Sequence, residues 1–84
     1  MDRDEALIAQ YLEPNPNRPG AADWWVKDRG VSVWALVGYW KTPGQDVESV
    51  ARAYAIPPEA VEAALAYYRR HQELIDDRLA ANAV

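Results

Sequence analysis

VESVARAYAIPPEAVEAALA, residues 47–66, is the stretch that decides the fold of this chain. Its first half places apolar residues three and four positions apart, the spacing that lines one face of a helix: Val47, Val50, Ala51 and Tyr54. The segment AIP at 55–57 breaks this period, and Pro58 starts a second helix because proline is well accommodated at the first helical position. The second apolar stripe consists of Val61, Ala64, Leu65 and Tyr68. Two helices joined by a tight turn predict a helix-turn-helix corner.

Two residues are expected to hold this corner together. Ala51 lacks bulk where the two helices cross, and Ile56 fills the gap between them at the turn. A DNA-reading corner enters the major groove with the N-terminal residues of its second helix. Here those positions carry Glu59 and Glu62 and no Arg, Lys, Asn or Gln, and carboxylates repel phosphates. The pattern therefore leaves two interpretations open, a DNA-binding element and a purely architectural one.

Composition limits the chain to one small domain. Half of its 84 residues are apolar, which supports a modest core and argues against disorder throughout. Nine basic and thirteen acidic residues give a net charge of −4, so any nucleic-acid contact requires a local patch or a dimer. The lack of cysteine excludes disulfides and thiolate metal sites and favours a cytoplasmic protein. No apolar run approaches the roughly 20 residues of a membrane-spanning helix, and the charged start MDRDE predicts no secretory signal.

The remaining sequence predicts a mainly α fold with a long C-terminal helix. Helices are expected over residues 4–12, 33–41, 46–54 and 58–80. Residues 1–21 combine the first helix with the connector PNPNRPG, whose prolines exclude helix and central strand. Residues 22–84 form the helix-turn-helix domain.

Two positions are expected to cap helices, and two runs are expected to pair. Ser32 and Asp46 stand directly before predicted helices and are suitable N-caps. The runs WWVK and VSV flank the turn DRG. They predict an extended segment at 23–27 within a small hairpin or a pair of extended segments.

Tryptophan carries much of the expected core. The run VWALVGYW at 33–40 is apolar around nearly its whole circumference, so a helix there is expected to be buried on all sides. Trp34 and Trp40 are then core residues. Trp24 and Trp25 are adjacent in an extended segment and point to opposite faces. One of these two is expected to be uncovered in a monomer and to lie at an interface.

The length of the last helix favours a homodimer. A helix over 58–80 is roughly 33 Å long, whereas a domain of this size is roughly 30 Å across. Its final third therefore extends beyond its own core, where the first helix or a second copy of the chain covers it; we expect the second copy. The residues expected at the dimer or partner interface are Trp24, Trp25, Tyr68, Ile75 and Leu79.

The residue inventory gives no support for catalysis. The chain has two serines and one histidine, His71, which lies in the charged run RRHQE of a solvated helix face. Asp76 and Asp77 are likewise expected to be solvated charges and not an acid/base couple. The glycines are too scattered for a phosphate loop. We expect neither enzyme activity nor a cofactor or metal.

Three blocks, in this order, carry a resemblance to a known family: GVSVWALV (30–37), ARAY (51–54) and AALAYYRRHQELID (63–76). Over roughly residues 22–82 the chain resembles the bacterial family called domain of unknown function 433. The chain departs from the family pattern at two places. Ser32 stands where the family has a proline before the Val-Trp pair, and residues 27–30 read KDRG where the family has Gly-Thr-Arg. The resemblance implies a helical fold with a homeodomain-like corner. It also implies an association with VapB-type antitoxins, which are encoded beside toxins of the PIN nuclease kind.

Two functions are compatible with these features. The first is a dimeric antitoxin-like regulator that binds a PIN-type nuclease toxin and its own operator DNA. The second is a protein-interaction or assembly module that keeps the corner and does not contact DNA. If DNA is bound, the contacts are expected from Lys27 and Arg29, helped by Arg52 and Lys41, and not from the first turn of the second corner helix. So few cations predict weak, salt-sensitive binding.

Overall fold

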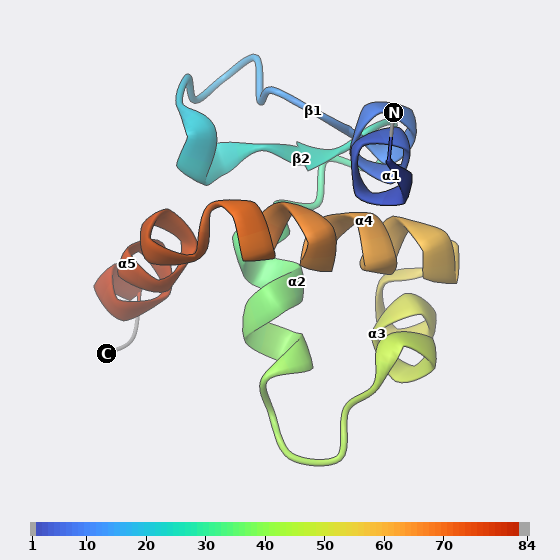
Figure 1. The fold of residues 1–84 in the computed structure, drawn as a ribbon. Coiled ribbons are helices and arrows are strands. Elements are labelled where there is room, and N and C mark those ends of the chain that lie inside the picture. The colour runs from blue at the N-terminus through green and yellow to red at the C-terminus, as the bar shows by residue number, and fades with distance from the viewer. Residues whose placement is uncertain (1, 83–84) are drawn as a thin grey trace.

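The computed structural model describes residues 2–82 and is mainly helical, as the sequence predicts. The elements in chain order are α1 (Arg3–Tyr11), β1 (Leu12–Glu13), the 3₁₀ helix η1 (Ala21–Asp23), β2 (Trp25–Val26), α2 (Val33–Trp40), α3 (Val47–Tyr54), α4 (Pro58–Arg70) and α5 (Gln72–Asn82). Helix α4 crosses the middle of the molecule, with α1 and the strands on one side and α2 and α3 on the other (Figure 1). Its buried residues are Ala60, Val61, Ala63, Ala64, Ala66, Tyr67 and Tyr68.

The corner between α3 and α4 forms around the two residues that the sequence singles out. Ala51 and Ile56 keep only 5% and 6% of their surface exposed. Asp46 is the N-cap of α3, where its carboxylate accepts a hydrogen bond from the Ser49 amide at 2.8 Å. The helix ends at Ala55 in the left-handed conformation (φ 55°), and the next amide bonds back to the Ala51 carbonyl at 3.0 Å. The turn is therefore fixed by backbone hydrogen bonds without a glycine.

Ala51→Leu is expected to lower the free energy of unfolding by about 1–3 kcal/mol, because the added atoms overfill the crossing of α3 and α4. Chemical denaturation followed by circular dichroism measures this change. Ala53→Leu is the matched control, since Ala53 is exposed on the same helix. Equal stability of the two variants would contradict a tight crossing at Ala51.

Strand β2 covers only the middle of the extended segment predicted at 23–27, because Asp23 belongs to η1. It pairs with the run that follows it. Trp25 forms an antiparallel bridge with Ser32, and the Val26 amide donates to the Val31 carbonyl at 2.8 Å. The predicted pairing around the DRG turn is thus confirmed. Ser32 also takes the predicted N-cap position of α2, but its side chain makes no cap hydrogen bond.

A second strand, which the sequence pattern does not indicate, completes the sheet. β1 pairs with β2 in antiparallel register, Leu12 opposite Val26 and Glu13 opposite Trp25. The Trp25 indole donates to the Glu13 carboxylate at 2.9 Å. These partners lie on either side of the connector at 14–20, so neither periodicity nor a turn signal relates them. The sheet attaches the end of α1 to the start of the corner domain.

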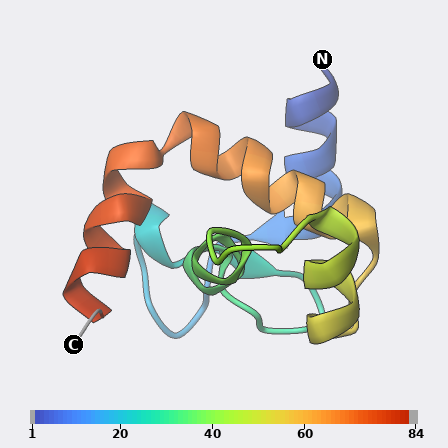
Figure 2. The same cartoon turned by 90° about the horizontal axis from the view of Figure 1, so that it is seen from below.

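The single C-terminal helix predicted over residues 58–80 is wrong. The chain forms α4 and α5 instead, with His71 between them at φ −132° and ψ 38°, outside the helical region. The sequence has neither glycine nor proline at the break, and its apolar residues keep a helical spacing on both sides of His71. The sequence therefore predicts one continuous helix. Helix α5 turns away from the line of α4 and lies beside η1 and α2 (Figures 1 and 2). Ile75 is fully buried by this turn, and Leu79 packs onto α2 at Gly38.

The break also removes the geometric reason for expecting a homodimer. The final third of the predicted helix does not extend beyond the core, because α5 covers its own chain. The principal extents of the molecule are 36 × 30 × 22 Å. Dimer formation stays a prediction, but overshoot of the last helix no longer supports it.

Candidate interaction site

The face of α4 opposite the corner is covered by α1. The two helices pack extensively, with Leu7 of α1 in the hydrophobic core. Three ion pairs tie the start of α1 to α4, namely Arg3–Glu62 at 2.9 Å, Asp4–Arg69 at 3.1 Å and Asp2–Arg70 at 3.2 Å. The hydrogen bond from the Glu5 amide, together with the Arg70 charge, holds the pKa of Asp2 below its ordinary value. Helix α4 therefore packs against α1 on one face and against α2 and α3 on another.

The exposed residues at the start of α4 include no side chain that donates hydrogen bonds to DNA. Pro57 and Glu59 are exposed, and Glu62 is half-buried and engaged by Arg3. A major-groove reader needs side chains there that donate to bases or phosphates. None of these three side chains is a cation or an amide that donates in this way.

Two of the four cations predicted to contact DNA are engaged within the chain. Lys27 donates from its Nζ to the Ala9 carbonyl at 2.7 Å. Lys41 lies at the C-terminal end of α2, where its Nζ bonds Asp76 at 3.1 Å and sits 5.0 Å from the centre of the Tyr68 ring. The Tyr68 hydroxyl donates to the same carboxylate at 2.7 Å, and this bond, with that of Lys41, lowers the pKa of Asp76. Lys41 therefore serves the packing of α5 and lies at the other end of α2 from the DRG turn.

The other two predicted cations are exposed and close to the corner. Arg29 and Arg52 form no ion pair among the described residues. Arg29 follows Asp28, whose positive φ of 63° tightens the turn. Arg52 lies in the last turn of α3, just before the corner. The structure thus separates the predicted set into two engaged lysines and two accessible arginines.

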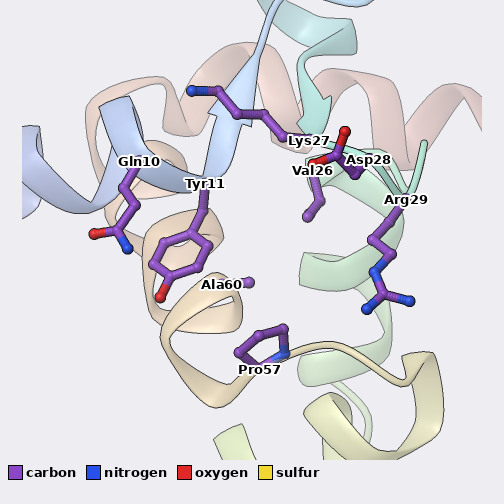
Figure 3. Close-up of a pocket in the computed structure, with 8 residues that line it drawn as sticks. All are labelled: Gln10, Tyr11, Val26, Lys27, Asp28, Arg29, Pro57 and Ala60. Atoms are coloured by element: carbon purple, nitrogen blue, oxygen red, sulfur yellow. The ribbon is translucent and has the colours of Figure 1, made fainter.

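A hollow of about 300 Å³ lies between the DRG turn, the end of α1 and the start of α4 (Figure 3). Its lining residues are Gln10, Tyr11, Val26, Lys27, Asp28, Arg29, Pro57 and Ala60. The Arg29 guanidinium and the Tyr11 hydroxyl both point toward the Pro57 side, whereas the Lys27 ammonium points away. The hollow therefore combines the accessible cation Arg29 with the apolar side chains of Val26, Pro57 and Ala60.

The residues predicted at a dimer or partner interface are largely used inside the chain. Ile75 and Tyr68 are buried, and Leu79 is half-buried against α2. Trp24 and Trp25 are both half-buried, so the expectation that one of them is uncovered is wrong. Trp24 stacks on Tyr67 with ring centres 5.2 Å apart. These side chains stabilise the monomer before any partner is considered.

Helix α2 is less enclosed than its composition suggests. Val33, Leu36 and Val37 are fully buried, whereas Trp34 and Trp40 are half-buried at the edge of the core. The prediction that this helix is buried on all sides is therefore wrong. Its aromatic side chains border the surface because the domain is too small to enclose them.

One buried polar contact has no signal in the sequence. Asp23, only 5% exposed at the end of η1, receives both guanidinium nitrogens of Arg78 from α5, one of them at 3.0 Å from Oδ2. Arg18 approaches the same carboxylate at 3.8 Å. Asp23 and Arg78 are 55 positions apart, and no local pattern relates them. This pair fixes α5 against η1.

Tyr67 lies next to this contact and joins the α4–α5 junction to η1. Its hydroxyl donates to the Ala21 carbonyl, and its ring centre is 4.3 Å from that of His71. Burial raises the pKa of Tyr67 to about 12. His71, expected on a solvated face, is half-buried against this ring.

The chain is expected to lose stability in alkali between pH 10 and pH 12. Ionised Tyr67 is penalised in the fold but not in the unfolded chain, where tyrosine titrates near pH 10. Because the folded pKa is the higher one, this contribution is complete below pH 10 and is lost as pH rises toward 12. Unfolding midpoints measured across this range, with tyrosinate absorbance, test this. Tyr67→Phe should flatten the decline; a decline in this variant as steep as in the unaltered chain would contradict the assignment.

Three further findings concern metals, membranes and relatives. No group of three or more His, Asp and Glu side chains within residues 2–82 is arranged to hold a metal ion. The helices in this part of the chain are all too short or too polar to cross a membrane. No protein-family model, curated protein or solved structure matches this chain.

Proposed function

We propose that this chain is a cytoplasmic, dimeric antitoxin-like regulator that acts mainly by binding a protein, a nuclease toxin of the PIN kind. The observation that carries this proposal is the coverage of α4 by α1, which favours a scaffold role for the helix-turn-helix corner. The sequence resemblance to domain of unknown function 433 supplies the class of partner. The acidic composition agrees with a protein-binding role, since a net charge of −4 disfavours general contact with nucleic acid.

The partner test uses the gene that lies beside this one. If that gene encodes a PIN-type nuclease, co-expression with this chain should restore growth that the nuclease alone arrests, and the two proteins should co-elute. A neighbouring nuclease that neither binds nor is inhibited would contradict the antitoxin role. The alternative, an assembly module without DNA contact, would then describe the protein better.

Operator DNA is the second candidate, and the exposure of Arg29 and Arg52 favours it. These arginines flank the start of α4, so a duplex would meet the turns beside the corner and not the α4 groove face. A dimer would present them twice. With so few cations, affinity should be low and should fall as salt rises, because fewer counterions are released.

A mobility-shift titration of the promoter DNA at two salt concentrations tests this surface. Arg29→Ala combined with Arg52→Ala should abolish the shift at low salt. Lys41→Ala is the matched control, because Lys41 is held by Asp76 away from the proposed surface. Undiminished binding by the double variant, or loss with the control alone, would contradict the assignment. No shift by the unaltered chain, alone or with its toxin, would favour the assembly module.

A further inference from the structure

Helix α5 is attached to the chain mainly through segments that are distant in sequence. It packs on α2 and η1 far more than on α4, which precedes it. Leu79 fills the space over Gly38, where a Cβ would lie 2.9 Å from its Cδ2. Arg78 reaches Asp23 of η1. The groove that holds α5 is therefore defined by residues that any copy of the chain presents, and nothing in its contacts requires α5 to come from the same chain.

The junction between α4 and α5 is one residue away from a continuous helix. The His71 amide donates to the Tyr67 carbonyl at 3.0 Å, the partner it would have in an unbroken helix. The Ile75 amide likewise donates to the His71 carbonyl at 3.0 Å. Only the backbone angles of His71 interrupt the run, and the junction holds neither glycine nor proline. Rotation at this residue would restore the missing helical hydrogen bonds.

A straightened helix cannot fill the groove of its own chain. At 1.5 Å per residue, residues 58–82 would extend for about 37 Å. The longest extent of the folded molecule is 36 Å. The α5 segment would then project from the domain and leave its own groove at α2 and η1 empty. A second copy in the same state would offer an identical empty groove.

An exposed apolar side chain lies beside the junction. Leu74 is 45% exposed and is the large hydrophobic residue left uncovered within the described part of the chain. It is three positions after His71, in the first turn of α5. In an exchanged pair, the two straightened junctions run side by side near the two-fold axis, where such a residue would be covered. The closed monomer gives Leu74 no comparable role.

We propose that two copies of this chain exchange their α5 helices, each α5 occupying the α2–η1 groove of the other copy while α4 and α5 form one continuous helix through His71. Exchange of an identical element is a low-cost route to a dimer because it reuses contacts that the monomer already makes. Arg78 then pairs with Asp23 of the second copy, and Leu79 covers Gly38 of the second copy. This inference rests on the dimer of the proposed function and specifies how that dimer is built.

A designed disulfide distinguishes the two arrangements. The chain has no cysteine, so Gly38→Cys combined with Leu79→Cys introduces a single pair of thiols, placed where α2 and α5 touch. The full chain is oxidised as a dilute sample, and its mass is read by light scattering and by denaturing electrophoresis without reductant. Leu79→Cys alone is the control for random cross-linking.

Each outcome decides the question. A dimer in solution that runs as two covalently linked chains supports the exchange. A dimer whose chains separate, because each disulfide closed within one chain, overturns the exchange and leaves the proposed dimer intact. A monomer in solution overturns both the dimer and the exchange, while the binding of a toxin would remain to be judged by its own test.

Charge reversal gives a second measurement that does not depend on the cysteines. Asp23→Arg and Arg78→Asp each place like charges together within their own chain. Co-expressed with different tags, the two variants complement each other only if α5 is exchanged, since each groove then receives an opposite charge. Soluble mixed dimers at more than tenfold excess over either variant dimer support the exchange. Equal failure of the variants together and apart overturns it.

Discussion

Arg78→Ala is expected to lower the free energy of unfolding by about 3 kcal/mol, because it leaves the buried Asp23 carboxylate without its main partner. The Asp23 side chain is 8% exposed, and that of Arg78 is 23% exposed. Arg18, whose side chain is 67% exposed, approaches Asp23 only at 3.8 Å and cannot replace the two hydrogen bonds of Arg78. For a domain of this size the loss corresponds to a fall of roughly 12–24 °C in the melting temperature.

Arg69→Ala is the matched control for this experiment. Arg69 also pairs with an aspartate, Asp4, but the two side chains are 60% and 32% exposed. Exposed pairs of this kind contribute less than about 1 kcal/mol because water solvates both charges in either state. Thermal melting of the two variants at one protein concentration gives the comparison. A loss for Arg78→Ala no larger than for Arg69→Ala would show that the Asp23 carboxylate is solvated by another route.

The sequence predicts the parts of the fold that depend on neighbouring residues. The stripe that includes Ala51, the cap at Asp46 and the restart at Pro58 act over a few positions, and the structure forms the corner as they indicate. The extended pairing of Trp25 with Ser32 is local in the same sense. Each of these signals predicts the local conformation of a few neighbouring residues, so the prediction does not depend on the rest of the chain.

The features that the sequence does not predict depend on residues far apart. Nothing near His71 indicates a break, because the contacts that compensate for it are made by Arg78 with Asp23 and by Leu79 at Gly38. The candidate interaction site shows the same limit. Lys41 and Arg29 both carry a positive charge, and the sequence does not show which of them is free. In the structure Lys41 pairs with Asp76, whereas Arg29 is exposed. Tertiary contacts thus decide which cations remain available to a partner.

Ile75→Ala is expected to lower the free energy of unfolding by about 3–4 kcal/mol, the usual loss when a fully buried Ile is cut to Ala and a cavity remains. Ile75 has no exposed surface, and it belongs to the hydrophobic core. Denaturant titration measures the change. The sequence pattern instead places this residue at an interface, where the same substitution would weaken association and leave the folded chain nearly unchanged.

Leu74→Ala is the matched control, because the neighbouring side chain on the same helix is 45% exposed. In the monomer its effect on unfolding should stay below about 1 kcal/mol, as for other surface substitutions. Both variants are measured at two protein concentrations, since the stability of an associating chain depends on concentration. A large loss for Leu74→Ala and a small one for Ile75→Ala would mean that α5 presents the opposite face to the core. A larger loss for Ile75→Ala than for Leu74→Ala would show that Ile75 is buried in the groove that holds α5. This result is expected whether α5 comes from the same copy of the chain or from a second one.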